Sequence, residues 1–276
     1  MEYKLYRLNA FPKKDSGGNP AGVVLNADSL SDEQMQQIAK EVNYSETAFV
    51  SKSCIADFKV RFFTPTNEVD LCGHATIATF NLLRDLDIIQ VGNYRQETKA
   101  GVLNIDVQSD FVYMQQKQPL FEDVFLSDDI QGCFQNEDFI DKKLPIVIIS
   151  TGIKEIFLPI ISDCVLHDLN PNYNKIIQIS KKYDVLGIHA FALAEKDVFA
   201  YGRNFAPLVG IDEESATGTS NGALSCYLNR YVNHTQTHFI LGQGYSMNLP
   251  SEILGKLIMK DGEISEVWVG GTARII

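Results

Sequence analysis

The feature that constrains the fold most is an internal repeat. Ala48-Phe49 and, further on, Arg61-Phe62-Phe63-Thr64-Pro65 recur with the same spacing as Ala190-Phe191 and Arg203-Asn204-Phe205-Ala206-Pro207. After a length difference of three residues, Cys72-Gly73-His74 aligns with Thr217-Gly218-Thr219, and an apolar run follows each, at 77–83 and 223–228. A chance match among hydrophobic strands is the alternative. A repeat of this kind predicts two copies of one α+β unit, paired as pseudo-symmetric lobes.

Local patterns predict the first elements of the fold. Residues 48–50, 58–63 and 102–107 are rich in β-branched and aromatic side chains, which is typical of strands. Residues 31–42 predict a surface helix, because Ser31 can cap it and the apolar residues after it recur at helical spacing.

The composition is that of a globular protein with no affinity for polyanions. The chain has 276 residues, 45% of them hydrophobic, and a formal net charge of -11. We expect neither nucleic acid nor a membrane as a partner, because both require a positive patch. The first residues lack the character of a signal peptide, and no apolar run approaches the roughly 18 residues of a membrane span, so a cytoplasmic location is expected.

Metal ligands and disulfides are not indicated by the spacing of cysteine and histidine. The five cysteines are scattered without a CxxC motif, so most are expected to be small core residues. His234 and His238 stand four residues apart, but the polar residues around them favour a turn before a strand at 239–241 over a metal site on a helix.

Each copy has a glycine at the start of its predicted apolar helix, Gly73 in the first and Gly218 in the second. Helix N-termini present unpaired N–H groups and a partial positive charge. Two such ends facing each other across a cleft would hold a small carboxylate even in an acidic protein.

Six further motifs occur in a fixed order along the chain. They are Gly18-Asn19-Pro20-Ala21-Gly22-Val23-Val24, Ser45-Glu46-Thr47-Ala48-Phe49, Phe63-Thr64-Pro65, Cys72-Gly73-His74-Ala75-Thr76, Glu214-Ser215-Ala216-Thr217-Gly218-Thr219 and Val267-Trp268-Val269-Gly270-Gly271-Thr272-Ala273. In that order they resemble the PhzF-type phenazine-biosynthesis isomerase family, from about residue 18 to the C-terminus.

The resemblance implies the diaminopimelate epimerase-like fold, in which two α+β lobes each wrap a sheet around a central helix. We therefore expect an N-terminal lobe of residues 1–115, completed by 265–276, and a C-terminal lobe of residues 116–264. Similar proteins form homodimers, so a homodimer is expected.

The resemblance also implies a chemistry. Isomerases of this family use a carboxylate base without a cofactor, and Glu46 stands at the matching position, with Ile188 as its counterpart in the second copy. His74 matches an acid that steadies charge on a substrate oxygen. Glu214 matches an acidic residue that orients a polar group, although the family usually has aspartate followed by proline at this point.

We therefore predict a cofactor-independent isomerase that moves a proton on a small carboxylate, with Glu46 as the shuttling base in the cleft between the lobes. Substrate-binding donors are expected at Gly73, Gly218 and Thr219, and no metal is expected. Asn19 either reaches the substrate or caps a turn.

Three alternatives stay open. The first is a non-catalytic small-molecule binding protein on the same scaffold. The second is an epimerase in which Cys72 acts with Glu46 or Glu214; a pair of thiols is disfavoured because Thr217 stands where the second cysteine would be. The third is a serine hydrolase, since residues 218–222 match G-x-S-x-G. It is disfavoured because residues 212–217 before the motif are not strand-like and because no Asp or Glu lies between Ser220 and His238, the last histidine.

Overall fold

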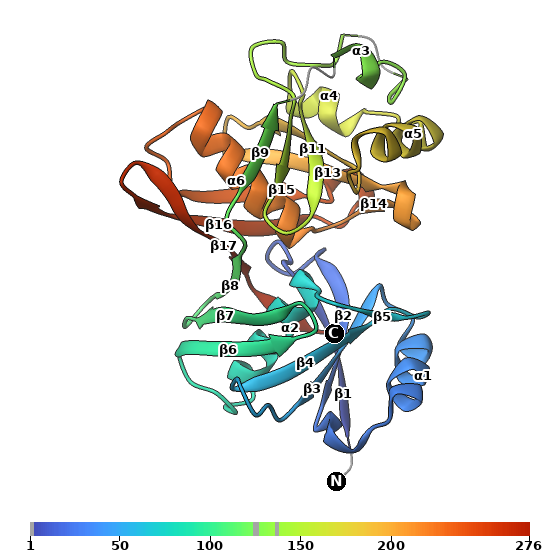
Figure 1. Ribbon diagram of the computed structural model, residues 1–276, viewed down its shortest axis with the longest axis vertical. Helices are drawn as coiled ribbons and strands as arrows, with labels where there is room; N and C mark the ends of the chain where they lie inside the picture. Colours follow the sequence, from blue (N-terminus) through green and yellow to red (C-terminus); the bar gives the residue numbers. More distant parts are fainter. Residues whose placement is uncertain (1–2, 124–126, 136–137) are drawn as a thin grey trace. The chain divides into compact units, whose positions relative to one another are not determined.

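The computed structural model describes residues 3–123, 127–135 and 138–276. The chain packs as two compact units (Figure 1). The first ends at Gln115 and is completed by Gly270–Ile276, and the second is Gln116–Val269.

The first unit contains part of a mixed sheet, two α-helices and one short 3₁₀ helix. Its strands are β1 (Lys4–Ala10), β2 (Asn19–Leu25), β3 (Glu46–Ser51), β4 (Phe58–Phe63), β5 (Glu68–Val69), β6 (Gly92–Thr98), β7 (Gly101–Val107), β8 (Val112–Gln116) and β18 (Ala273–Ile275), and its helices are α1 (Asp32–Val42), α2 (Gly73–Asp85) and the short η1 (Ala27–Ser29). The predicted strands and the helix after Ser31 are confirmed. Ser31 and Gln34 form a capping box at the start of α1.

The second unit repeats this arrangement with additional short elements. Its strands are β9 (Leu120–Asp123), β10 (Val147–Ser150), β11 (Lys154–Pro159), β12 (Ile188–Leu193), β13 (Ala200–Ala206), β14 (Ile211–Glu214), β15 (His238–Gln243), β16 (Ser251–Lys260) and β17 (Glu263–Gly271), and its helices are α3 (Ser127–Ile130), α4 (Asp163–His167), α5 (Tyr173–Tyr183), α6 (Gly218–Tyr231), η2 (Pro207–Val209) and η3 (Tyr245–Met247). The expected strand after His238 is confirmed as β15.

Strand order confirms that the chain is two copies of one α+β unit. In the first unit β1 pairs antiparallel with β2, β2 parallel with β3, β3 antiparallel with β4, and β4 parallel with β6. In the second unit β10, β11, β12, β13 and β15 follow one another in the same order and directions. Both copies therefore share one pattern, in which a central antiparallel pair of strands is flanked on each side by a parallel pair.

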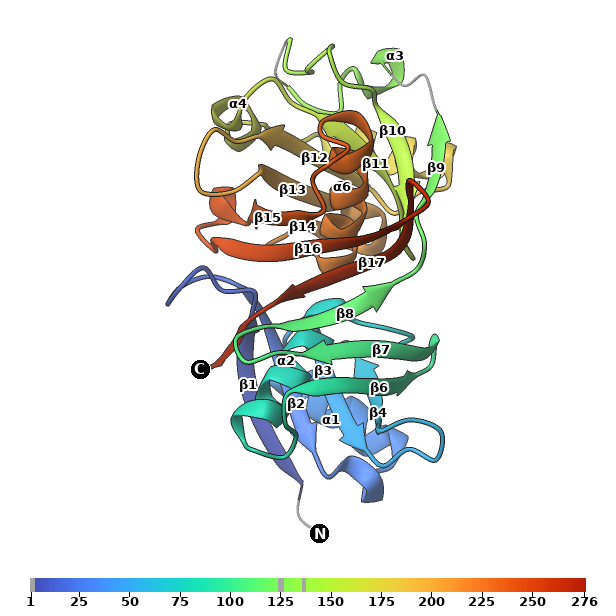
Figure 2. The same ribbon diagram turned by 90° about the vertical axis from the view of Figure 1, so that its left-hand side faces the viewer.

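One helix occupies the centre of each unit. Every residue of α2 from His74 to Leu83 is buried, and α6 is buried almost throughout. A helix that is buried on all sides must be enclosed by its own sheet. Accordingly α2 packs on β1, β2, β3, β7 and β18, and α6 packs on β10, β15 and β16 (Figure 2).

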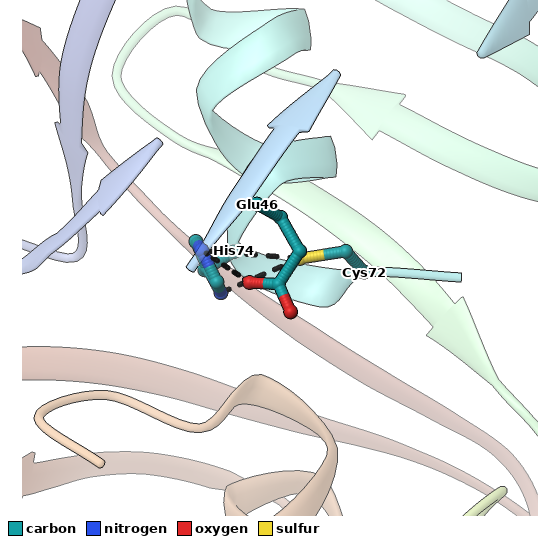
Figure 3. A group of neighbouring side chains, drawn as sticks. All are labelled: Glu46, Cys72 and His74. Carbon is teal, nitrogen blue, oxygen red and sulfur yellow. Dashed lines mark hydrogen bonds and ion pairs between the residues drawn. The ribbon is translucent and has the colours of Figure 1, made fainter. Parts of the chain in front are cut away.

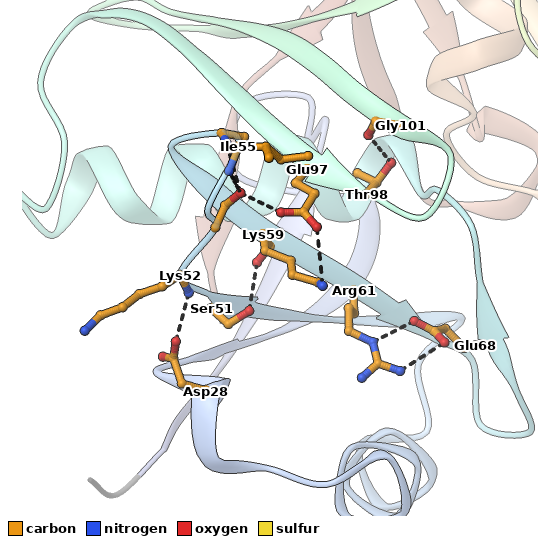
Figure 4. A network of polar contacts seen from close by, with 12 residues as sticks. Asp28, Ser51, Lys52, Ile55, Lys59, Arg61, Glu68, Glu97, Thr98 and Gly101 are labelled. Atoms are coloured by element: carbon orange, nitrogen blue, oxygen red, sulfur yellow. Dashed lines mark hydrogen bonds and ion pairs between the residues drawn. The ribbon is translucent and has the colours of Figure 1, made fainter.

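A partly buried arginine–glutamate pair marks the same place in each unit. Arg61 Nε on β4 donates to Glu68 Oε1 on β5 at 2.7 Å (Figure 4), and Arg203 Nε on β13 donates to Glu213 Oε1 on β14 at 2.8 Å. Both pairs are bidentate, which fixes their geometry. The expectation that residues 212–217 are not strand-like is therefore wrong for residues 212–214, which belong to β14, because the pairing with β13 overrides the low strand propensity of acidic residues.

The two copies differ by one residue in strand register. Arg61 faces Phe49 across β3 and β4, whereas its equivalent Arg203 faces Ala190 across β12 and β13. A slip of one residue moves every side chain to the other face of the sheet. Phe49 therefore packs with α1, whereas Phe191 packs with α6. The sequence alignment of Ala48-Phe49 with Ala190-Phe191 has matching spacing, but the aligned residues do not occupy equivalent positions in the two sheets.

The register also corrects the counterpart of Glu46. Ala190 is the structural equivalent of Phe49, because both face the conserved arginine of the repeat. Counting back three residues from each makes Gly187, rather than Ile188, the counterpart of Glu46. A Cβ at Gly187 would lie 1.9 Å from the carbonyl oxygen of Phe205. The second copy therefore has no room for any side chain where the first copy has a carboxylate.

Within the ranges that the structure describes, no helix combines the length and the apolar character that crossing a bilayer requires.

Candidate active site

The first residues of β2, β3 and α2 lie close together in the first unit. Strands β2 and β3 are parallel, with Ala21 opposite Glu46, so Asn19 and Glu46 lie at the same ends of neighbouring strands. Helix α2 begins nearby with Cys72 as its N-cap and His74 in its first turn. No hydrogen bond from the side chain of the N-cap residue Cys72 caps this helix end.

Glu46, Cys72 and His74 form a compact cluster at this place (Figure 3). Glu46 Oε2 lies 3.4 Å from His74 Nε2, and Cys72 Sγ lies 3.4 Å from His74 Nδ1. Asn19 Nδ2 lies 3.3 Å from the same Nδ1, and Ser45 Oγ lies 3.4 Å from Nε2. The imidazole is thus contacted by polar groups from both strands and from its own helix.

Burial keeps the imidazole neutral. The side chain of His74 is 5% exposed, and desolvation lowers its pKa below the usual value of 6.5. The nearby Glu46 carboxylate and a hydrogen bond to the Pro20 backbone act in the opposite direction without reversing the shift. A neutral imidazole at the positive end of a helix can donate a hydrogen bond to an oxygen that gains negative charge.

The Glu46 carboxylate is partly exposed. Its side chain is 16% exposed, so it combines contact with His74 and partial access to ligand. A partly enclosed carboxylate within reach of a bound molecule can act as a general base.

The predicted residues of the second unit gather at the start of α6. Thr217 Oγ1 donates to Glu214 Oε2 at 2.7 Å, and Gln243 Nε2 donates to the Glu214 carbonyl at 2.7 Å. Gln243 also accepts from the Thr217 backbone N–H at 3.1 Å. Thr219 occupies the first turn of α6, and its carbonyl accepts from Thr151 Oγ1 at 3.2 Å. Gln243, at the end of β15, therefore holds the Glu214 backbone in place, and Thr217 holds its carboxylate.

A buried polar cluster lies beneath the first turn of α6. Ser220 donates to Glu155 Oε2, and Asn204 Nδ2 lies 2.7 Å from Glu155 Oε1 and 3.3 Å from His189 Nδ1. All four side chains are nearly inaccessible to solvent. Burial raises the pKa of Glu155 and lowers the pKa of His189 from 6.5 to about 3.

The equivalent positions of the first unit are apolar. The strand registers and the two helix starts match Glu155, His189, Asn204 and Ser220 with Ala21, Ala48, Phe62 and Ala75, all of which are fully buried. The cluster therefore belongs to one copy of the repeat, and it explains the burial of Ser220. A serine that donates to a buried carboxylate is not an exposed hydrolase nucleophile, so the G-x-S-x-G match has no catalytic meaning here.

The His189 imidazole is expected to make folding stability depend on pH. Its pKa is about 3 in the folded protein and 6.5 when exposed, so below pH 6.5 the unfolded chain binds a proton that the folded chain does not. Stability should fall as the pH drops from 7 to 5, by up to about 2 kcal/mol from this group. Thermal unfolding of the wild type and of His189→Gln measures the effect.

The raised pKa of Glu155 acts in the opposite direction, because the folding stability that this group contributes at low pH is lost as the pH rises above 4.5. Glu155 titrates in both proteins, so the difference between the wild type and His189→Gln isolates the histidine. Parallel pH profiles of the two proteins would refute the assignment.

Sequence patterns located some of these groups and missed others. Glu46, His74 and Asn19 come together in the first unit, with Gly73 at the start of the same helix; Glu214, Gly218 and Thr219 come together in the second. Ser45 and Gln243 had no assigned role, and no sequence motif distinguishes Gln243 from other polar residues at strand ends. Cys72 was expected to be structural, yet its thiol is within hydrogen-bonding distance of His74.

A separate hollow of about 490 Å³ lies in the first unit at the opposite ends of the same strands. Its lining includes Leu25 at the end of β2 and Val50 near the end of β3. Neither Glu46 nor His74 lines it, so it is not part of the cluster.

Comparison with known proteins identifies the family. The family model for phenazine biosynthesis-like proteins, PhzC-PhzF, matches residues 8–276. An uncharacterized isomerase of Clostridium acetobutylicum is 34% identical over all of this chain and 96% of its own length. The uncharacterized isomerase YddE of Escherichia coli K12 is 31% identical over all of this chain and 97% of its own length.

Solved structures agree. The crystal structure of a PhzF-family phenazine biosynthesis protein of Bacillus anthracis has a TM-score of 0.91 and 32% identity, covering all of this chain and 98% of that one. A hydroxyproline epimerase of Agrobacterium vitis, at 10% identity and a TM-score of 0.64 over 99% of this chain and 90% of that one, shares the fold alone. The predicted diaminopimelate epimerase-like architecture is confirmed, and this chain is an isomerase of the phenazine biosynthesis-like PhzC-PhzF family.

Proposed function

We propose that the protein is a cofactor-independent isomerase that moves a proton between two atoms of a small carboxylate, with Glu46 as the base. The observation that carries the proposal is the Glu46 carboxylate 3.4 Å from the buried, neutral His74 at an uncapped helix start. A base and a neutral donor at this separation can remove a proton from carbon and stabilise the charge that develops on a neighbouring oxygen.

The proposal divides the remaining tasks between the two units. In the first, Asn19 orients the His74 ring, and the N–H groups that begin with Gly73 offer donors to the substrate. In the second, Gly218 and Thr219 supply donors for the substrate carboxylate, because they begin α6 and this helix end is also without a side-chain cap. Glu214 orients a polar group of the substrate.

Deuterium incorporation tests the proposal. A panel of small amino, hydroxy and cyclic dienyl carboxylates is incubated with the protein in D₂O and followed by NMR. Exchange of a carbon-bound hydrogen, or conversion to an isomer, identifies the substrate class. A ligand that raises the melting temperature and yet never exchanges would instead support a binding protein on this scaffold.

An epimerase that uses Cys72 is the second candidate, because the Cys72 thiol lies 3.4 Å from His74 Nδ1 in the same cluster. Serine is nearly the size of cysteine, but its hydroxyl group does not ionise at neutral pH as a thiol can. If Glu46 is the sole base, Cys72→Ser should keep most of the exchange rate. If Cys72 is a base, the rate should fall by at least about 100-fold.

A further inference from the structure

We propose that Glu155 makes carboxylate binding at the start of α6 depend on a proton. The protonated side chain leaves this helix end positive, and the ionised side chain weakens binding. The inference rests on the part of the proposed function in which Gly218 and Thr219 hold the substrate carboxylate. Glu155 acts from beneath the helix, without contact with the substrate, because its exposed fraction is only 1%.

Glu155 contacts the first turn of α6 directly. Ser220 is the third residue of this helix, and its hydroxyl group donates to Glu155 Oε2. Asn204 Nδ2 on β13 donates to Glu155 Oε1 at 2.7 Å. Because Ser220 follows Gly218 and Thr219, a charge on Glu155 lies about one helical turn from the N–H groups that would hold a carboxylate.

The fold itself does not require this carboxyl group. The first unit has the same strand order around its own central helix, and it fills the four positions of the polar cluster with buried apolar residues. Buried polar groups cost stability unless all of them are hydrogen-bonded. Here His189 Nε2 has no hydrogen-bond partner within the described ranges. The second unit therefore keeps a costly, titratable group that its sister copy replaces, which is typical of a functional site.

No charge in contact with Glu155 offsets its own. Its hydrogen-bond partners among the described residues are the uncharged Ser220 and Asn204. The His189 imidazole beyond Asn204 is neutral, because burial lowers its pKa to about 3. Two like charges about one helical turn apart in a protein repel strongly enough to change affinity on the order of 10-fold or more.

The direction of the pH dependence follows from these contacts. Burial raises the pKa of Glu155, which brings its ionisation toward neutral pH. As the pH rises through this pKa, a negative charge forms beneath the positive helix end, and the Kd of a carboxylate bound there increases. By linkage, a bound carboxylate raises the pKa of Glu155 in turn, so binding takes up a proton from solvent.

Acetate is the probe for the test, because its binding requires neither Glu46 nor turnover. The full-length, ¹⁵N-labelled protein is titrated with acetate between about pH 5.5 and about pH 8, where acetate is largely ionised. The amide resonances of Gly218 and Thr219 give the Kd. The Kd of the wild type should rise on the order of 10-fold as Glu155 ionises. The ¹³C carboxyl resonance that is missing in Glu155→Gln reports this ionisation directly.

Glu155→Gln keeps the size of the side chain but cannot ionise. Its Kd should stay at the low value throughout, so that it binds acetate more tightly than the wild type at the upper end of the pH range. Structural damage alone would not strengthen binding. Glu122→Gln is the matched control, because it removes an exposed carboxylate of the same unit that pairs with Lys154 on the strand of Glu155. It should keep the wild-type profile.

Ser220→Ala is the second variant, and it introduces the residue that the first unit has at the equivalent position, Ala75. It removes a donor to the ionised carboxylate, so the ionisation of Glu155 and the rise in Kd should move together to higher pH. Glu214 also faces this helix end through Thr217, but it is present in every variant and cancels in the comparison.

Three results would overturn the inference: a wild-type Kd that stays flat while Glu155 ionises, a Kd in Glu155→Gln that rises as in the wild type, or a Glu155 carboxyl resonance that does not titrate in this range. Acetate that leaves the resonances of Gly218 and Thr219 unchanged at every pH would also remove carboxylate binding from the proposed function. Acetate binding without deuterium exchange of any carboxylate in the panel would count against the role of Glu46 alone.

Discussion

Replacing Glu46 with glutamine is expected to reduce proton exchange by about 100- to 10,000-fold, the usual range for loss of a general base. Glutamine has the same shape and can still contact His74, but it cannot take a proton from carbon. Because the Glu46 side chain is partly exposed and glutamine has nearly the same size, the melting temperature should be almost unchanged. Deuterium exchange and circular dichroism of the same preparation measure both effects.

Two further variants make the result specific. Glu41→Gln removes an exposed carboxylate on α1 that contacts only Gln37 in its own helix among the described hydrogen bonds, and it should leave the exchange rate unchanged. Glu46→Asp keeps the base but withdraws it by one methylene, so it should recover part of the activity. Full turnover by Glu46→Gln would remove Glu46 from the mechanism.

Replacing Gly187 with alanine is expected to be among the most destabilising single changes in the chain. The added Cβ would lie 1.9 Å from the Phe205 carbonyl oxygen and 3.1 Å from Ala206 Cα, and neither backbone atom can rotate away. Separating β12 from β13 to relieve the clash should cost more than about 3 kcal/mol. Thermal unfolding should show a drop of at least about 6 °C.

Gly222→Ala is the matched control within the same unit. Gly222 lies inside α6, and a Cβ there would meet its nearest neighbour, Gln116 Cγ, at 3.4 Å, an ordinary contact. Alanine favours a helix interior by roughly 0.5–1 kcal/mol over glycine, so this variant should be neutral or more stable. Equal stability of the two variants would show that β13 moves at little cost to accommodate the Cβ added at Gly187.

The sequence predicted the overall architecture because duplication leaves the same arginine, phenylalanine and glycine positions in both copies. Arg61 and Arg203 form the same bidentate pair, and Gly73 and Gly218 begin the two central helices. Helix α1 was predicted to the residue, since a capping serine and an amphipathic pattern are local signals.

The register could not be predicted from spacing. Phe49 and Phe191 are equally apolar, and the face on which each packs depends on hydrogen bonds between strands rather than on the residues themselves. The polar cluster around Glu155 was missed for a similar reason, because Glu155, His189 and Asn204 are far apart in sequence and each resembles a surface residue when considered alone. Cys72 was judged structural because its distance to His74 and Glu46 exists only in three dimensions.

The absence of a side chain at Gly187 has a stereochemical consequence. An enzyme with a base in each copy can remove a proton from one face of a carbon and return another to the opposite face, which inverts the centre. Here the position that carries Glu46 in the first copy has no room for a base in the second. With Glu46 as the sole base, as proposed above, a proton that it removes is returned by the same carboxylate on the same side of the substrate, whereas a second base at Cys72 or Glu214 would allow inversion. The isomerisation should therefore be suprafacial, and a chirally deuterated substrate should keep its label on one face of the product.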